Sequence, residues 1–388
     1  MAKPKIRFKG YTDDWEQRKL GEVLDDMYNG QTPSRKRDEY WNGNIRWLSS
    51  GELNRGTVYS SIETITEEGK NSANLRVVPK GTFVMAITGL EASGTRGNCA
   101  LLGFDTTLNQ SCMALFPKQD ILISQFLFQW YRMVGEEYGI NYTQGTKQQS
   151  YNAELIKILP ILLPSIDEQK KIASYLNSID HLITLHQRKC EETKKLKKYM
   201  LQKMFPQNGQ TVPEIRFASF TDAWEQRKLS DLYAPLVERN SDLLPYDKTF
   251  SVASMTYKFD GNGAADSSLA NYKRLRIGDI AFEGHTSKIF RYGRFVLNDV
   301  GDGIMSPRFS ALRPLVQMPI NFWKYYIHYE PIMRKVLVNS TKAGTMMNEL
   351  VVDEFLKNSV LVPSVEEQTC IGDILKKIDH LITLHHRK

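Results

Sequence analysis

Two blocks of sequence occur twice in this chain, in the same order. Residues 6–20 (IRFKGYTDDWEQRKL) return at 215–229 with 11 of 15 positions identical. Residues 162–189 return at 361–388 with 17 of 28 positions identical, best in the stretches LxPSxxEQ and IDHLITLH. Such internal similarity is typical of a duplicated structural unit. Because 388 residues also exceed the length of one average domain, the sequence predicts two similar domains.

The two regions between these blocks differ almost completely. The first covers residues 20–162 and the second covers residues 229–361. One weak similarity remains between them, a Gly-Thr pair that begins at Gly145 in the first region and at Gly344 in the second. Each Gly lies 24 residues before the Gln of the Glu-Gln pair in the following repeated block. Similar repeated blocks around dissimilar regions indicate that both halves share one fold while their surfaces have different functions.

The second repeated block predicts a long helix. Ser165 can cap its start, acidic residues follow, and no helix breaker occurs before Pro206. The resulting helix would have about 38 residues and span about 57 Å. Apolar residues at alternating steps of four and three predict a coiled-coil seam at Ile172, Leu176, Ile179 and Ile183, and in the second copy at Ile371, Leu375, Ile378 and Ile382. In the first copy the seam weakens at His186, Cys190 and Thr193 and resumes at Leu196, Met200 and Met204.

Two interpretations of this helix are open. It can pack on its own domain, or it can act as a spacer between domains. Helices this long commonly reach between domains, which favours the spacer. The second copy stops at Lys388 without a counterpart of residues 190–204, so we expect a truncated distal helix.

The regions between the repeats are predicted to be mixed α/β (α+β). Strands are expected at 82–88, 99–104, 111–116, 279–283 and 294–298, and helices at 123–138 and 321–329, the latter ended by Pro331. The overall expectation is two similar recognition domains joined by long helices that form an antiparallel, pseudo-twofold coiled-coil spacer. Its expected parts are a first domain at 1–163, a central helix at 164–205, a linker at 206–214, a second domain at 215–362 and a distal helix at 363–388.

Composition restricts the class of protein without naming its function. The formal charge of +7 is compatible with a polyanionic partner. Four cysteines without regular spacing suggest neither disulfides nor zinc. The longest nearly apolar stretch, residues 158–163, is far too short for a membrane span, and the start has no signal-peptide core. A cytoplasmic protein is therefore expected.

None of the candidate catalytic motifs in the sequence is complete. Residues 139–147 resemble a phosphate-binding loop but have five intervening residues where four are needed, and Thr precedes Lys. Residues 259–263 match the short FxGxG of amino-methyltransferases, yet the chain contains no Pro-Pro for the partner motif. The histidines, of which His181, His186, His380, His385 and His386 lie in the repeated helix, lack metal-site spacing. We expect no catalytic residues, metal or cofactor in this chain.

The order of shared block, variable region, LxPSxxEQ, long helix and repetition resembles the specificity subunit (HsdS) of type I restriction-modification enzymes. The resemblance covers essentially the whole chain, and WEQRKL at Trp15 and Trp224 and the PSxxEQ motifs at Pro164 and Pro363 carry it. It implies two target-recognition domains that each read half of a bipartite, asymmetric DNA site. It also implies modification subunits, two in number, that use S-adenosylmethionine to methylate adenine, and restriction subunits that use ATP and magnesium.

Residues that read bases are expected on exposed polar loops, because Arg, Lys, Asn, Gln, Ser and Thr match the donors and acceptors of base edges. In the first half we select Thr88, Arg96, Asn98, Gln144, Thr146, Lys147, Gln148, Gln149 and Ser150. In the second half we select Lys288, Arg291, Arg294, Ser306, Arg308, Lys342 and Thr345. The alternatives from other classes are a DNA methyltransferase or nuclease with an unrecognised active site, and a coiled-coil scaffold without a nucleic-acid partner.

Overall fold

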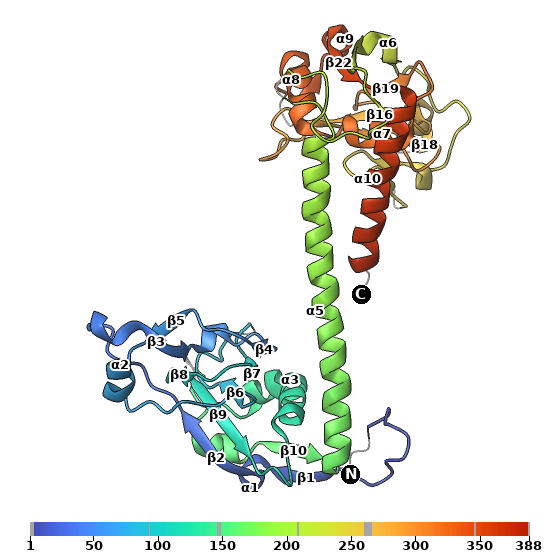
Figure 1. Ribbon diagram of the computed structural model, residues 1–388. Coiled ribbons are helices and arrows are strands. Elements are labelled where there is room, and N and C mark those ends of the chain that lie inside the picture. Colours follow the sequence, from blue (N-terminus) through green and yellow to red (C-terminus); the bar gives the residue numbers. More distant parts are fainter. Residues whose placement is uncertain are drawn as a thin grey trace. The chain divides into compact units, whose positions relative to one another are not determined.

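A computed structural model describes residues 4–92, 94–145, 149–207, 209–259, 266–344 and 347–386. The chain divides into two compact units, Met1–Ile183 and Thr184–Lys388, hereafter unit 1 and unit 2 (Figure 1). The boundary falls within helix α5 (Ile166–Lys203), so this 38-residue helix begins in unit 1 and ends in unit 2. The predicted long helix is thus confirmed. None of the described helices combines the length and apolarity that a membrane span requires.

Unit 1 is built on a five-stranded sheet in the order β2-β9-β6-β7-β4, beside a three-stranded sheet in the order β5-β3-β8. Its strands are β1 (Glu16–Lys19), β2 (Leu24–Asn29), β3 (Trp41–Leu48), β4 (Thr57–Val58), β5 (Glu63–Ile65), β6 (Phe83–Ala86), β7 (Cys99–Leu102), β8 (Thr107–Leu108), β9 (Cys112–Pro117) and β10 (Pro160–Leu163). Its helices are α1 (Leu20–Val23), α2 (Glu67–Ser72), α3 (Ser124–Asn141), α4 (Ala153–Lys157) and the first part of α5.

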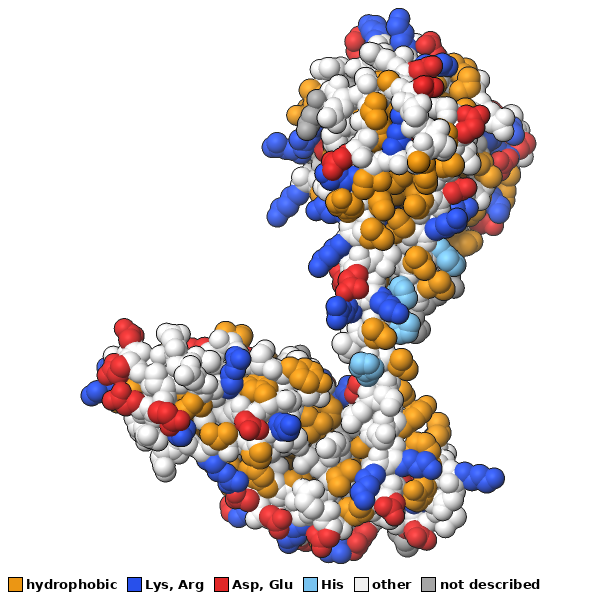
Figure 2. Space-filling model, in the orientation of Figure 1, with side chains coloured by type: hydrophobic (Ala, Val, Ile, Leu, Met, Phe, Trp, Pro, Cys, Tyr) orange, Lys and Arg blue, Asp and Glu red, His pale blue; other side chains and the backbone are white. Residues whose placement is uncertain are grey.

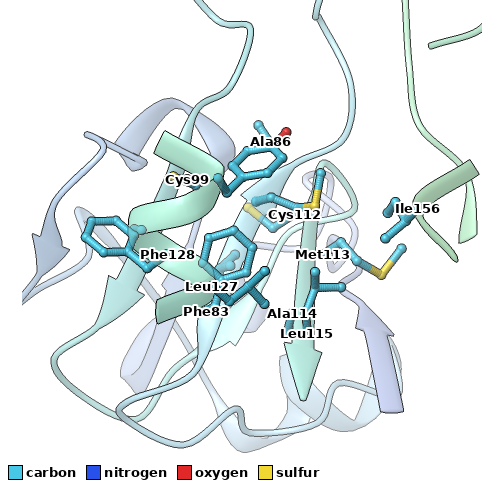
Figure 3. Close-up of a cluster of buried hydrophobic side chains, with 14 of the residues drawn as sticks. Phe83, Ala86, Cys99, Cys112, Met113, Ala114, Leu115, Leu127, Phe128 and Ile156 are labelled. Atoms are coloured by element: carbon cyan, nitrogen blue, oxygen red, sulfur yellow. The ribbon is translucent and has the colours of Figure 1, made fainter. Parts of the chain in front are cut away.

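The core of unit 1 lies between the five-stranded sheet and α3. All four residues of β6 are buried, as are the four of β7, because both faces of these central strands are covered. Figure 3 shows Leu127 and Phe128 from α3 beside Phe83 and the sulfur atoms of Cys99 and Cys112. The predicted strands at 82–88, 99–104 and 111–116 and the predicted helix at 123–138 therefore form the core.

Unit 2 repeats this plan. Its four-stranded sheet has the order β12-β19-β16-β17, which matches β2-β9-β6-β7, and every neighbouring pair in both sets is antiparallel. The strands are β11 (Glu225–Lys228), β12 (Tyr233–Pro235), β13 (Phe250–Ser251), β14 (Thr256–Tyr257), β15 (Lys273–Leu275), β16 (Ile280–Glu283), β17 (Arg294–Leu297), β18 (Gly303–Met305), β19 (Ala311–Pro314), β20 (Thr341–Lys342), β21 (Glu349–Leu350) and β22 (Ser359–Val362). The two divergent inserts therefore share one mixed α/β fold.

The helices of unit 2 differ from expectation at one point. They are α6 (Leu229–Leu232), α7 (Ile320–Tyr326), α8 (Glu330–Ser340), α9 (Val352–Lys357) and α10 (Val365–His386), together with the end of α5. The helix predicted near 321–329 is present as α7, but its predicted end at Pro331 is wrong. The first helix ends at Tyr326, and Pro331 lies in the first turn of the next one. Proline fits there because the first amides of a helix have no intrahelical partner.

The shared blocks close each unit. The WEQRKL block forms β1, which pairs antiparallel with β10, the strand that leads into α5. The second copy forms β11, which pairs with β22 in the same way. One further backbone hydrogen bond at the end of each ladder joins the first residue of the insert to its last residues. It runs from Leu20 N to Leu159 O (2.9 Å) in unit 1 and from Leu229 N to Asn358 O (2.8 Å) in unit 2. The repeat is thus a frame that holds an insert by both ends.

A buried ion pair fastens each frame to its helix. The Arg7 guanidinium donates two hydrogen bonds to the Glu168 carboxylate, each 2.7 Å, and the Glu168 side chain is almost fully buried. Arg216 holds Glu367 likewise, at 2.7 and 2.8 Å. The Gln that follows each Glu is also buried, and its amide donates to the carbonyl of Pro164 or Pro363. The Glu-Gln pair is therefore required by the frame.

Replacing Glu168 by Gln is expected to lower the free energy of unfolding, because the substitution removes the charge of the buried carboxylate that accepts both hydrogen bonds from Arg7. Urea denaturation followed by tryptophan fluorescence measures this. The matched control is Glu154→Gln, since Glu154 forms a solvent-exposed pair with Lys157 and should change stability by less than about 0.5 kcal/mol. Equal effects of the two substitutions would contradict a structural role for the buried pair.

Candidate nucleic-acid interface

In unit 1, four of the selected residues lie together where β6 and α3 end. Gln144 and Ser150 exchange backbone hydrogen bonds of 3.0 and 2.9 Å, which makes a short hairpin after α3. Ser150 also forms a β-bridge with Thr88, and the Gln149 carbonyl accepts from Leu90 N. The hairpin is thereby attached to the loop that follows β6. Thr146, Lys147 and Gln148, which come between Gln144 and Gln149 in the sequence, lie outside the described residues.

Arg96 and Asn98 hold this loop in place. The Arg96 guanidinium donates to the carbonyls of Leu90 (2.8 Å) and Glu91 (2.7 Å). The Asn98 side-chain oxygen accepts from Arg55 Nε at 3.3 Å. Because these polar groups are used within the loop, both residues position the candidate interface. The sequence-based selection assigned them to base contacts, which the structure does not test.

Unit 2 places a hairpin at the corresponding point. Strands β20 and β21 pair Thr341 with Leu350 and Lys342 with Glu349, directly after α8, as the first hairpin follows α3. Gly145 and Gly344 occupy the two turns, so the weak Gly-Thr similarity marks one shared element. Lys342 Nζ lies 3.2 Å from Glu349. Thr345 lies outside the described residues.

A second contact ties the unit 2 hairpin to the loop after β16. Asn348 N donates to Gly284 O (3.0 Å), and the Asn348 amide donates to Arg291 O (3.2 Å). Gly284 permits this approach, since a Cβ there would lie 2.0 Å from the Asn348 carbonyl oxygen. A hollow of about 380 Å³ opens beside the junction, and Arg308 lines it. Sequence reasoning missed Gly284 and Asn348, because neither shows an isolated pattern.

Basic side chains of unit 2 lie both beside the hairpin and along the sheet. Lys288, Arg291 and Arg308 are exposed beside the hairpin junction. Acidic partners instead surround the far end of the sheet, where Arg276 and Arg313 bind Glu238 and hold its pKa at about 2. On the face that Figure 2 shows, basic and acidic side chains are intermixed over both units. The three basic side chains near the hairpin thus lie together with the acidic Glu349, which pairs with Lys342.

Arg294 and Ser306, which the sequence predicted to contact bases, make contacts within unit 2. Arg294 donates to Ala253 O at 3.0 Å, and its guanidinium lies 5.0 Å from the centre of the Phe290 ring. The Ser306 carbonyl accepts from Phe309 N, which shapes the turn that presents Arg308.

A polar hollow of about 690 Å³ in unit 1 was not foreseen. Its lining is rich in groups that donate or accept hydrogen bonds: Tyr28, Asn29, Gln31, Thr32, Pro33, Ser34, Arg37, Tyr40, Ser72, Ala73 and Asn74. The sequence signal was present, because residues 29–34 (NGQTPS) form a polar run between two strands. Such groups suit base edges or phosphates.

The expected helix seam is formed in unit 2. Ile371, Leu375, Ile378 and Met204 are buried there, and Ile382 O lies 3.9 Å from Cys190 Sγ. Lys197 on α5 binds Asp379 on α10 at 2.6 Å, and His186 Nδ1 lies 3.2 Å from His385 Nδ1. These contacts show that α10 runs antiparallel to the end of α5. Leu196 is exposed outside the seam, and Met200 is half-buried.

The described residues contain no group of three or more His, Cys, Asp or Glu side chains able to hold a metal ion. Burial raises the pKa of the Cys99 thiol to about 12 and that of Cys112 further, so both stay protonated at neutral pH. These thiols are therefore core residues without nucleophilic character.

Comparison with known proteins agrees with this architecture. Residues 12–195 match the family described as type I restriction modification DNA specificity domain. The chain is 25% identical over 369 residues to the type I restriction enzyme MjaIX specificity subunit of Methanocaldococcus jannaschii, covering 90% of this chain and 83% of that protein. It is 28% identical over 183 residues to the EcoR124I/EcoR124II specificity subunit of Escherichia coli, covering 46% and 43%.

Among solved structures, the fold resembles that of the S subunit of a type I restriction-modification system from M. genitalium. The TM-score is 0.60 with 13% identity, and the match covers 99% of this chain and 94% of that one. The sequence match, the duplicated frame and the shared fold agree with the resemblance found in the repeats. The chain is thus similar to the specificity subunits (HsdS) of type I restriction-modification enzymes, and residues 12–195 match the model of their DNA specificity domain.

Proposed function

We propose that this chain recognises a bipartite, asymmetric DNA site, with each unit reading one half. The observation that carries the proposal is that both units have the same sheet order and a hairpin joined to the loop after the equivalent inner strand, β6 or β16, while the side chains at that place differ. Unit 1 presents Gln144, Gln149 and Ser150, whereas unit 2 presents Lys288, Arg291 and Arg308. One fold with two different contact surfaces is what two different half-sites require.

The chemistry is assigned to other chains. The relatives are named specificity subunits of type I restriction enzymes. We therefore infer that this chain is non-catalytic and acts in the cytoplasm with two modification subunits and with restriction subunits. In that assembly the modification subunits use S-adenosylmethionine to methylate adenine, and the restriction subunits use ATP and magnesium to translocate and cleave DNA. The helix pair α5 and α10 supplies an extended surface for docking.

Methylome sequencing of a host that carries the complete complex tests the proposal. Modified adenines are expected in one motif with two constant parts separated by a gap of fixed length. Purified complex should also retard duplex DNA that contains this motif, more weakly as salt rises, because phosphate contacts release counterions. A coiled-coil scaffold would retard no DNA, and a methyltransferase in this chain would modify DNA without partners. Either result would contradict the proposal.

Arg308→Ala is expected to affect one half-site. A lost bidentate contact to a base costs about 1–3 kcal/mol and relaxes specificity at one position. Competition binding with DNA variants at each position measures this. The matched control is Arg334→Ala, because Arg334 is an exposed arginine of the same unit that binds Glu330. An equal loss of affinity for every variant would show that Arg308 is a general phosphate anchor.

A further inference from the structure

Strand β16 of unit 2 ends in a buried carboxylate. All four residues of the strand are buried, and Glu283 is the only charged one among them. The Glu283 side chain is 7% exposed. Burial of a charged carboxylate is unfavourable unless the group is paired and hydrogen-bonded, so a strand covered on both faces ordinarily carries apolar side chains. The partner of Glu283 therefore indicates what the carboxylate does at this position.

That partner is His285, two residues further along the chain. One oxygen of the Glu283 carboxylate accepts from the backbone N of His285 (3.0 Å) and lies 2.5 Å from Nδ1 of the His285 ring. Arg294, the cross-strand neighbour of Glu283, donates instead to Ala253 O. Among the residues that the structure describes, every hydrogen bond and ion pair of this carboxylate is made with His285. The buried carboxylate thus holds one histidine.

The pair determines which nitrogen of the ring carries the proton. An ionised carboxylate only accepts hydrogen bonds, so the ring nitrogen that faces it must donate, and the proton of a neutral imidazole is then on Nδ1. The other nitrogen, Nε2, remains an acceptor. It makes no hydrogen bond with the described part of the chain, and the His285 side chain is 63% exposed. His285 accordingly presents one oriented acceptor to solvent.

The loop that carries His285 is attached to the hairpin of unit 2. Asn348 N donates to the carbonyl of Gly284, the residue before His285, at 3.0 Å. The Asn348 side chain donates to Arg291 O at 3.2 Å, so the loop is held on either side of His285. Lys288 and Arg291 of the same loop are exposed. The acceptor therefore has a defined place on the surface that we propose to face DNA.

We infer that His285 contacts an amine-bearing base, adenine or cytosine, in the half-site of unit 2, and that Glu283 is its positioning residue. In the major groove an acceptor on the protein complements the exocyclic amines, N6 of adenine and N4 of cytosine. The same acceptor is repelled by the carbonyl oxygens of guanine and thymine. The contact rests on the proposed function, because it requires that unit 2 faces base edges.

Competition binding tests the contact. The complete complex is bound to the site found by methylome sequencing, and to variants that carry each base in turn at every position of both half-sites. At one position of one half-site, His285→Ala should lower the preference for adenine or cytosine over guanine and thymine by about tenfold. His285→Arg offers donors only, so it should shift the preference at that position toward guanine or thymine. All other positions should keep their preferences.

Glu283→Gln tests the positioning role in the same assay. The amide of Gln both donates and accepts, so the ring is free to carry its proton on either nitrogen, and the preference at that one position should weaken. In a chain that already carries His285→Ala, Glu283→Gln should have no further effect on that preference. The matched control is Glu354→Gln, because Glu354 binds Lys357 in a solvent-accessible pair of the same unit. This control should leave every preference unchanged.

Two results would overturn the contact while the proposed function stands, since the wild-type complex binds its site in both. One is a His285→Ala complex with unchanged preferences at every position. The other is an equal loss of affinity for all variants, which would assign His285 and Glu283 to the structure of the loop. The exposed His285 can be replaced without disturbing the core, so its variants decide even if Glu283→Gln fails to fold. A wild-type complex that binds no DNA would overturn both proposals.

Discussion

A chimera in which residues 230–360 come from another specificity subunit should recognise a DNA site with one new half and one unchanged half. The insert of unit 2 begins and ends at the same place, where Leu229 N bonds to Asn358 O and β11 pairs with β22. Both cut points therefore lie next to a ladder that the repeat itself supplies. The core of unit 1 contains none of the exchanged residues. Methylome sequencing of a host that carries the chimera measures the new site.

The reciprocal exchange is the matched control. Replacing residues 21–161 uses the equivalent junction, the bond from Leu20 N to Leu159 O, and should change the other half of the site. Together the two chimeras assign each unit to its half-site. A chimera that assembles normally yet alters both halves would contradict separate recognition by the two units.

The frame could be predicted from the sequence because it is repeated within it. Identity between the blocks predicted one fold for two unlike inserts, and the shared order of the sheets confirms it. The long helix was predictable because its apolar spacing is regular and no breaker interrupts it before Pro206. The buried Arg7 and Glu168 lie 161 residues apart, so their pairing follows from the fold alone.

The candidate interface was predictable only in outline. Polar composition identified the hairpin of Gln144 and Ser150, but it could not separate Arg96, which bonds to carbonyls of its own loop, from residues that face solvent. The junction of Gly284 and Asn348 depends on a backbone contact between segments 64 residues apart, which local patterns do not encode. The role of Pro331 was also mispredicted, because proline is compatible both with the end of one helix and with the first turn of the next.

Lengthening α5 by four residues should increase the preferred gap between the half-sites by about one or two base pairs. The helix is continuous from Ile166 to Lys203 and crosses the boundary between the units. Four residues add about 6 Å, and duplex DNA rises about 3.4 Å per base pair. They also add about 40° beyond a full turn, so part of the change should appear as a rotation of the preferred site.

The insertion belongs between Thr184 and Leu185. The side chains of residues 181–185 are exposed, and the contacts with α10 described above lie at His186 and beyond, so the seam of unit 2 is preserved. The same four residues placed after Gln210, in the segment that follows α5, form the control and should leave the optimum unchanged. Methylation of a series of DNA targets that differ only in gap length gives the optimum for each protein. If the helix insertion leaves that optimum unchanged in an assembled complex, α5 does not set the gap, and its remaining role is to dock partner subunits.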